Sequence, residues 1–380
     1  MSVSWDVFNE NVKEFPTVVP LPDDEFYPLD DAKSLRAAVK GFGTDEQVIL
    51  NILCQRSSAQ RQTIIECYHR TFFRYLIADL KSDLSGNFEN VIVGLMMPTE
   101  RYCAHQLHKA FRSKSHDVLV EILCSRSHEE VAKIATAYED MYDSSLASDI
   151  KKETCGSYQR LLLLILQKLN DQSCGYGDFA YDPDIASQQA RIIFKAVKGN
   201  FRTDENAFLD IFGYAAQRRH QTCLIFHEYQ RISGKSIEET LKSQTSGVLL
   251  NSLLTIVKSV NNRALYFAER LHRAMKGLGT DDNSLIRIIV SRCEIDLLNI
   301  MFEYERIYGK TLFSAVKEET SGYYRRSLLT IIGMEQLVKS MPSPSSCCSL
   351  TSLSDRQIPW YQSQQSLGWH IRETIRKFQN

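Results

Sequence analysis

Two short glycine-containing loops, each followed at the same distance by an acid, carry the clearest chemistry in this sequence. Residues 39–44 read VKGFGT and residues 275–280 read MKGLGT, and 42 residues after the first glycine of each loop stand Asp83 and Glu319. Glycines allow a tight turn to direct successive carbonyl oxygens to one side. Three carbonyls and a bidentate carboxylate would supply about five hard oxygens, and Ca²⁺ takes about six to eight. The pattern predicts two calcium sites with positions left open for water or a foreign oxygen.

Other interpretations of these two loops are weaker. A GxGT sequence between helices is often only the end cap of one helix and the start cap of the next, but the matched spacing to a carboxylate in two places favours a metal. A phosphate-binding loop is disfavoured because no strand precedes either loop and no Gly-Lys-Ser or Gly-Lys-Thr follows. Mg²⁺ fits poorly because it demands a near-ideal octahedron and dehydrates reluctantly.

The composition narrows the class of protein. The chain has 380 residues, 43% apolar and 24% charged, with a formal net charge of −1, so it offers no global field for nucleic acid or for an acidic membrane. The longest apolar run, 161–166, is far shorter than the ~18 residues of a membrane span. The first residues lack the features of a secretory signal, which predicts a cytoplasmic protein. No HExxH and no Ser/His/Asp or Cys/His set can be singled out, so we expect no enzymatic activity.

The chain repeats itself four times. A tyrosine stands 18 residues before the glycine of SDLSG, KETCG, SQTSG and EETSG. These pairs are Tyr68 and Gly86, Tyr138 and Gly156, Tyr229 and Gly247, and Tyr304 and Gly322. Self-similarity at such intervals predicts a repeat architecture in which the units share cores or stack.

Within each repeat the apolar residues follow a helical period. Phe88, Val91, Ile92 and Leu95 stand at i, i+3, i+4 and i+7, and polar breaks separate about five such segments per repeat. Residues 44–47, TDEQ, have the form of a capping box that would open the second helix of the first repeat. We therefore predict an all-α fold of four small helical bundles.

The predicted organisation places additional segments around the four repeats. The repeats are expected at 31–97, 98–169, 187–260 and 261–335, with an N-terminal arm at 1–30, a linker at 170–186 and a C-terminal tail at 336–380. The linker is rich in Gly, Asp and Pro. The tail contains a Ser-, Pro- and Cys-rich stretch, and its end carries a basic amphipathic pattern that predicts a short helix.

The sequence resembles one known family. The loop KGFGTDE, the segment RSSAQRQ and the acid-containing DLSG, repeated with variations, are similar to the motifs of annexins over residues 32–335. The resemblance implies five helices per repeat, a slightly curved disc, and type II calcium sites that bridge to anionic phospholipid. The expected function is calcium-dependent binding to phosphatidylserine-type membranes, with a role in membrane organisation or trafficking.

The resemblance also implies roles for individual residues. The first site would use the carbonyls of Val39, Gly41 and Gly43 and the side chain of Asp83. The second site would use the carbonyls of Met275, Gly277 and Gly279 and the side chain of Glu319. Secondary metal sites of the family would use Thr44 with Glu46 and Thr280 with Asp282. Lipid contacts are expected from the loop residues Lys40, Phe42, Lys276 and Leu278.

The second and third repeats depart from this pattern. The loop of the second repeat has no glycine and is two residues short, although Glu153 stands at the acid position. In the third repeat, Arg202 replaces the last glycine and Gln244 replaces the acid. A cation beside the site and a neutral amide opposite it should both disfavour Ca²⁺. We predict no type II site in either repeat.

The main alternative is a calcium-independent helical scaffold that binds protein partners. The arm 1–30, with Trp5 and Phe8, is where annexins dock such partners. We expect a monomer in solution that associates reversibly with the cytosolic face of the plasma membrane or of vesicles, with lateral assembly there as an open alternative. Nucleic acid is not an expected partner.

Overall fold

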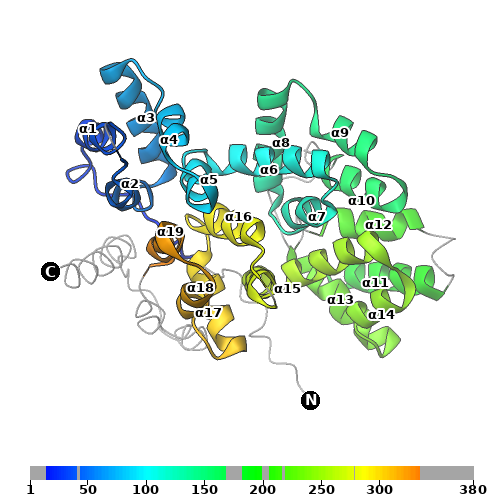
Figure 1. Ribbon diagram of the computed structural model, residues 1–380. Coiled ribbons are helices and arrows are strands. Elements are labelled where there is room, and N and C mark those ends of the chain that lie inside the picture. Colours follow the sequence, from blue (N-terminus) through cyan, green and yellow to red (C-terminus); the bar gives the residue numbers. More distant parts are fainter. Residues whose placement is uncertain are drawn as a thin grey trace, which may run out of the picture. The chain divides into compact units, whose positions relative to one another are not determined.

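The structure is a computed structural model that describes residues 14–40, 43–167, 182–198, 205–215, 219–277 and 279–333. Every regular element in these ranges is an α-helix (Figure 1), which confirms the all-α prediction. Within the same ranges, no helix has both the length and the apolar character that crossing a bilayer requires.

Five helices form each of the first two repeats. The first repeat contains α1 (Pro28–Ala38), α2 (Glu46–Leu53), α3 (Ser58–Phe72), α4 (Leu76–Asp83) and α5 (Gly86–Leu95). The second contains α6 (Thr99–Ser113), α7 (His116–Cys124), α8 (His128–Tyr142), α9 (Leu146–Glu153) and α10 (Gly156–Gln167).

The third and fourth repeats share one long helical segment. The third repeat contains α11 (Pro183–Lys198), α12 (Glu205–Gly213), α13 (Arg219–Ser233), α14 (Ile237–Gln244) and the first part of α15 (Gly247–Met275). The fourth contains the rest of α15, α16 (Asp282–Arg292), α17 (Leu297–Tyr308), α18 (Leu312–Glu319) and α19 (Gly322–Ile332).

A kink divides α15 between these two repeats. Asn262 has φ −153° and ψ 99°, which are not helical values. Its side-chain oxygen accepts a hydrogen bond from the backbone N–H of Leu265 at 2.9 Å, as the cap of a new helix does. The fifth helix of the third repeat therefore ends at the kink, and the first helix of the fourth repeat begins there.

Some of the expected segments lie partly or wholly outside the described residues. Helix α11 begins at Pro183, so the last residues of the expected linker 170–186 are helical. Outside the described ranges lie residues 170–181 of that linker, the C-terminal tail with its predicted helix, and the aromatic residues Trp5 and Phe8 of the arm.

The helices gather into two compact units (Figure 1). Unit 1 combines the first and fourth repeats, with boundaries at Pro98 and Ala268, and unit 2 combines the second and third, from Thr99 to Phe267. The repeats at the two ends of the sequence thus share a core. Both predicted calcium loops belong to unit 1.

Polar contacts join the first and fourth repeats within unit 1. The carboxylate of Glu294 pairs with Arg61, whose side chain is 2% exposed, and accepts from the backbone N–H of Ser58 at 2.8 and 2.9 Å. The described part of the N-terminal arm reinforces this junction, since the backbone N–H groups of Thr17 and Val18 both donate to the carbonyl of Cys293. These contacts fix the two loop-bearing repeats relative to each other.

Unit 2 uses equivalent positions to join its own two repeats. In unit 1, Arg326 of α19 donates to Gln47 of α2 at 3.2 Å. In unit 2, Asn251 of α15 donates to Asp117 of α7 at 3.1 Å. Arg326 and Asn251 each stand four residues after the glycine that begins the fifth helix of their repeat. Gln47 and Asp117 each stand two residues after the residue that caps the second helix of theirs. The two units are therefore built on one internal plan.

Candidate functional site

The loop of the fourth repeat is held by its glycines and by one backbone hydrogen bond. Gly277 has φ +118° and Gly279 has φ +91°, a region that residues with a side chain rarely adopt. The N–H of Asp281 donates to the carbonyl of Ala274 at 2.8 Å and closes the loop. Leu278 lies outside the described residues.

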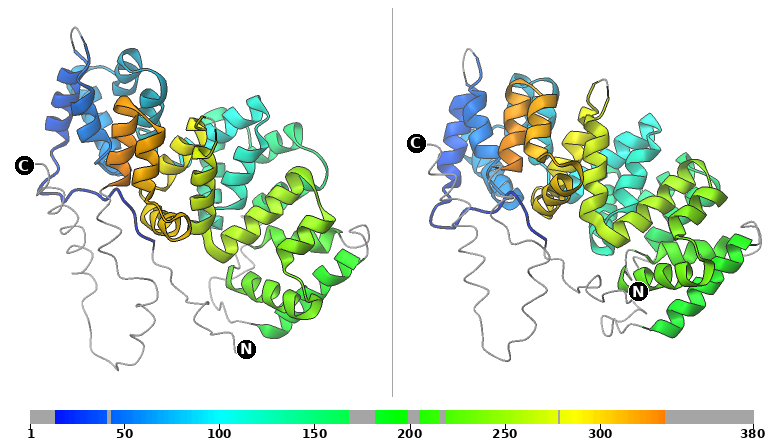
Figure 2. Two further views of the ribbon diagram at one scale, coloured as in Figure 1. Left: turned by 60° about the horizontal axis from the view of Figure 1, so that its bottom comes forward. Right: turned by 90° about the horizontal axis from the view of Figure 1, so that it is seen from below.

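The loop of the first repeat has the same construction wherever it is described. The N–H of Asp45 donates to the carbonyl of Ala38 at 3.0 Å, seven residues back, as Asp281 does in the fourth repeat. Gly43 has φ +91°, the same value as Gly279. Gly41 and Phe42 fall outside the described residues. The ends of α1 and α15 that carry the two loops lie on the same side of unit 1 (Figure 2, right).

The start of α2 differs in one detail from the sequence prediction. The cap is Asp45, whose side-chain oxygen accepts from the N–H of Val48 at 3.1 Å, and not Thr44. Asp281 caps α16 in the same way, through the N–H of Ser284 at 3.1 Å. The capping-box prediction was wrong by one residue, because closure of the loop places Thr44 before the helix begins.

Glu319 lies against the fourth-repeat loop. The Thr280 hydroxyl donates to a carboxylate oxygen of Glu319 at 3.3 Å and lies 3.4 Å from its backbone carbonyl. Glu319 is the last residue of α18 and is exposed, and we find no ion pair to it in the described part of the chain. An acid 39 residues from Thr280 in sequence is thus available at the loop. Carboxylate, hydroxyl and carbonyl oxygens are the donors that a hard cation such as Ca²⁺ prefers.

Asp83 occupies the equivalent position in the first repeat but lies differently. It is the last residue of α4 and is exposed, and its carboxylate accepts from the hydroxyl of the adjacent Ser82 at 2.9 Å. In the described part of the first repeat, no hydrogen bond joins Asp83 to its loop. Its side chain is one methylene shorter than that of Glu319, which accounts for the shorter reach.

The acids expected at secondary metal sites have different environments. Asp282 accepts from the Asn87 side chain at 2.6 Å, which joins the first and fourth repeats, and from the Tyr324 hydroxyl of its own repeat at 2.8 Å. Burial, followed by the hydrogen bond to Asp282, raises the pKa of Tyr324. The pairing of Asp282 with Thr280 at an ion stays a prediction. Glu46, at the first turn of α2, remains a prediction.

The exposure of the loop lysines suits a surface contact. Lys40 and Lys276 are both exposed at the two loops. The apolar residues expected beside them, Phe42 and Leu278, lie outside the described residues.

The second repeat closes its loop over a shorter span. Here the N–H of Ser115 donates to the carbonyl of Ala110 at 2.9 Å, only five residues back. Lys114, with φ +54°, takes the left-handed position, and Glu153 is exposed at the end of α9. Two fewer residues leave fewer carbonyls to face that acid. In the third repeat, residues 199–204 lie outside the described ranges, and α14 ends at Gln244.

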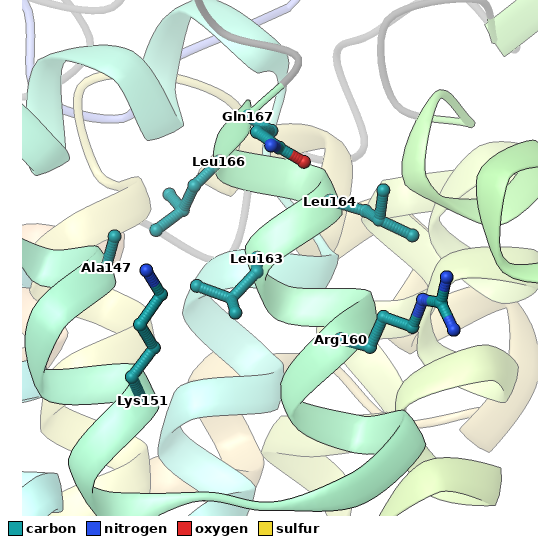
Figure 3. A pocket seen from close by; sticks show the side chains of 7 residues that line it. All are labelled: Ala147, Lys151, Arg160, Leu163, Leu164, Leu166 and Gln167. Carbon is teal, nitrogen blue, oxygen red and sulfur yellow. The ribbon is translucent and has the colours of Figure 1, made fainter. Parts of the chain in front are cut away.

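One surface hollow in unit 2 has the wrong lining for calcium. It lies along α9 and α10, with leucines between a lysine and an arginine and no acid among the lining residues (Figure 3). The lining residues are Ala147, Lys151, Arg160, Leu163, Leu164, Leu166 and Gln167.

Replacing Gly279 with Ala tests the loop conformation. An alanine at φ +91° would be strained by about 1–2 kcal/mol, although nothing lies within 4 Å of the added Cβ. We expect Gly279→Ala to raise the calcium needed for half-maximal vesicle binding by about tenfold. Gly234→Ala is the matched control, since Gly234 has φ +71° and equally open surroundings but lies at the end of α13. An equal effect of both substitutions on calcium dependence would contradict the assignment of the loop.

Comparisons with known proteins cover the same four repeats. A family model described as Annexin matches residues 30–95, 102–165, 188–256 and 266–331. Over 310 residues, the chain is 44% identical to annexin A4 of Homo sapiens, which covers 81% of this chain and 95% of that protein.

Solved structures show the same likeness. A structure of annexin III matches with a TM-score of 0.78 and 41% identity, over 84% of this chain and 97% of that one. A structure described as calcium-bound annexin (Sm)1 matches with a TM-score of 0.71 and 32% identity, over 84% and 93% of the two chains.

Proposed function

Because this chain belongs to the annexin family, whose general property is calcium-dependent phospholipid binding, we propose that it binds anionic membranes through type II calcium sites in its first and fourth repeats. The observation that carries the proposal is the placement of the exposed Glu319 carboxylate against the glycine loop at Thr280. The matching closure of the first-repeat loop supports a second site with Asp83.

The residues of each site have distinct tasks in this proposal. The first site would use the carbonyls of Val39, Gly41 and Gly43 with Asp83. The second would use those of Met275, Gly277 and Gly279 with Glu319. Bound Ca²⁺ supplies the positive charge that a protein of net charge −1 lacks toward an anionic leaflet. Lys40 and Lys276 are exposed in the two loops and would meet headgroup phosphates.

Lipid and calcium should strengthen each other's binding. One carboxylate per site is few, so the affinity for Ca²⁺ without lipid should be weak, on the order of 10⁻⁴ to 10⁻³ M. A phosphatidylserine-type headgroup would complete the open coordination positions, and the linkage between the two ligands must be reciprocal. Both sites belong to the compact unit 1, which adds avidity on a membrane.

The shared coordination predicts a particular lipid dependence. The calcium concentration at half-maximal vesicle binding should fall as the fraction of phosphatidylserine rises, because more headgroups compete to fill the open positions. Co-sedimentation with vesicles of graded composition measures this. An unchanged calcium requirement would contradict a coordination sphere shared with lipid.

Vesicle binding in the presence of a chelator distinguishes the proposal from the alternative, a calcium-independent scaffold for protein partners. Binding to phosphatidylserine vesicles should be lost in EGTA if the proposal holds, and should persist if the loops merely cap helices. In the proposed role the protein has no enzymatic activity and associates reversibly with the cytosolic face of the membrane. A protein partner at the N-terminal arm and lateral assembly on the membrane remain predictions.

A further inference from the structure

The described part of the N-terminal arm presents apolar side chains to solvent where α1 begins. Tyr27 is 61% exposed and Leu29 is 41% exposed. The apolar residues around them are only partly buried: Leu21, Pro22, Phe26 and Pro28. Residues 21–30 are called the arm surface below. Apolar side chains that lie together in solvent mark interaction sites, whereas isolated ones are ordinary.

Hydrogen bonds hold the arm surface in place. The N–H of Leu21 donates to the side-chain oxygen of Gln60 at 3.1 Å, and the Gln60 amide donates to the Leu21 carbonyl at 2.9 Å. The Tyr27 hydroxyl donates to the carbonyl of Asp24 at 2.8 Å, which fixes the exposed ring against the preceding turn. A partner would therefore meet a surface that is already formed, so that binding costs little conformational entropy on this side.

The arm surface is also acidic. Its sequence, LPDDEFYPLD, contains four acids and no Lys or Arg. Asp23, Asp24 and Glu25 are exposed, and we find no ion pair to them among the described residues. Asp30 lies 3.7 Å from Lys33, and both of these side chains are exposed, so this pair is weak. Charge complementarity favours a partner that carries cations around an apolar centre.

The C-terminal tail of the same chain contains a segment of this composition. Residues 371–378 read IRETIRKF, with three cations and one acid. Ile371, Ile375 and Phe378 stand at i, i+4 and i+7, a spacing that an α-helix would place on one face. The segment therefore matches the arm surface both in charge and in apolar content.

The chain leaves α19 on the side of unit 1 that carries the arm surface. Arg326, near the start of α19, contacts Gln47 beside the first calcium loop. In both views of Figure 2, the end of α19 and the start of α1 lie on the side of unit 1 away from that loop. Residues 334–370 can span at most about 120 Å, whereas α1 is about 16 Å long. The segment can thus reach the arm surface of its own molecule, and attachment to one chain raises its local concentration.

We infer that residues 371–378 dock on the arm surface of the same molecule. The apolar face of the segment packs on Tyr27 and Leu29, and its cations meet the surrounding acids. The contact lies at the opposite end of α1 from the first calcium loop and leaves that loop uncovered. It needs neither calcium nor lipid, so this inference is independent of the proposed function.

Photochemical cross-linking of the full chain tests this contact. Phe378 is replaced by the photoreactive p-benzoyl-phenylalanine, and the protein is irradiated at micromolar concentration in EGTA without lipid. Trypsin digestion and mass spectrometry then locate the cross-links. We expect the tryptic peptide 14–33, which contains the arm surface, to be the main product. An equal mixture of unlabelled and ¹⁵N-labelled protein should give cross-links mainly between peptides of the same label.

Two variants remove the two parts of the complementarity. Tyr27→Ser with Leu29→Gln removes the exposed apolar side chains and should lower the yield of this cross-link at least fivefold. Asp23→Asn, Asp24→Asn and Glu25→Gln together remove three exposed charges and should lower the yield about threefold or more. Raising the sodium chloride concentration from 0.05 to 0.5 M should lower the wild-type yield in the same direction. Melting temperatures confirm that each variant is folded.

A second exposed aromatic pair of unit 1 provides the matched control. Phe73 is 85% exposed and Tyr75 is 70% exposed, and the exposed Arg70 lies close to them in sequence. A basic segment has no electrostatic reason to dock there. Phe73→Ser with Tyr75→Ser should therefore leave the cross-link to peptide 14–33 unchanged.

Three results would overturn the inference. Cross-links spread over the chain without enrichment in peptide 14–33 would leave the arm surface to another protein. Equal yields from the wild type and the Tyr27→Ser, Leu29→Gln variant would show that the exposed apolar side chains do not hold the segment. Mixed-label cross-links as frequent as same-label ones would assign the contact to the tail of a second copy. Because no calcium or membrane is present, none of these results bears on the calcium sites.

Discussion

Replacing both site acids, Asp83→Asn with Glu319→Gln, is expected to raise the calcium needed for half-maximal binding to phosphatidylserine vesicles by about 100-fold or more. Each proposed site has one carboxylate, so each substitution removes the only formal negative charge opposite the ion. A loss of about 1.4 kcal/mol at each site corresponds to tenfold, and loss of both sites also removes the avidity of unit 1. Calcium titration of vesicle co-sedimentation measures the effect.

The single substitutions should differ in size. Glu319→Gln should weaken binding more than Asp83→Asn, because the longer Glu319 side chain already lies against Thr280, whereas the Asp83 carboxylate accepts from the adjacent Ser82. Equal effects of the two would contradict the argument from side-chain length.

Glu153→Gln is the matched control for both acids. Glu153 is an exposed acid at the same position of the second repeat, where the loop is two residues shorter. It should leave calcium dependence unchanged. Calcium-dependent binding that survives in the Asp83→Asn, Glu319→Gln variant would place the sites elsewhere.

Glu294→Gln is expected to lower the free energy of unfolding by about 3–5 kcal/mol, the usual cost of removing one partner of a buried ion pair. Arg61 is 2% exposed, and its guanidinium would lose its charged partner inside the junction of the first and fourth repeats. The N–H of Ser58 would keep a weaker acceptor. Urea unfolding followed by circular dichroism measures the change.

Two further variants test whether this loss of unfolding free energy comes from the buried ion pair. Glu318→Gln should change stability by less than about 1 kcal/mol, because Glu318 pairs with Lys310 and is 62% exposed. Arg61→Met combined with Glu294→Gln should recover part of the stability, since no buried charge is then unpaired. A loss at Glu294→Gln no larger than at Glu318→Gln would show that the pair does not hold the repeats together.

Local signals in the sequence predicted much of the fold and part of the site. Helical periodicity, the fourfold spacing from tyrosine to glycine and the paired glycines depend on residues close together in the chain, and the all-α repeat fold was confirmed. The glycines at 43, 277 and 279 do adopt positive φ. The 42-residue offset also pointed correctly to the end of α18, because the repeat fixes how far that helix end lies from the loop. Calcium ligation by these residues stays a prediction.

Other features depend on contacts between residues distant in sequence. The sequence repeats in order, but the first repeat packs with the fourth, and Glu294 is used to join them. The sequence predicts Asp282 as a loop acid, yet it accepts from Asn87 across that junction and from Tyr324 within its own repeat. No sequence motif singles out Phe73 and Tyr75, which the fold leaves 85% and 70% exposed at the turn before α4.

The amino-acid order therefore determined the helices, their number in each repeat and which loops could turn sharply enough to direct carbonyls. The tertiary structure alone decided which acids are free for an ion and which are committed to packing. The physical reason is that a helix is set by neighbours a few residues apart, whereas the availability of a carboxylate depends on every donor that folding brings beside it.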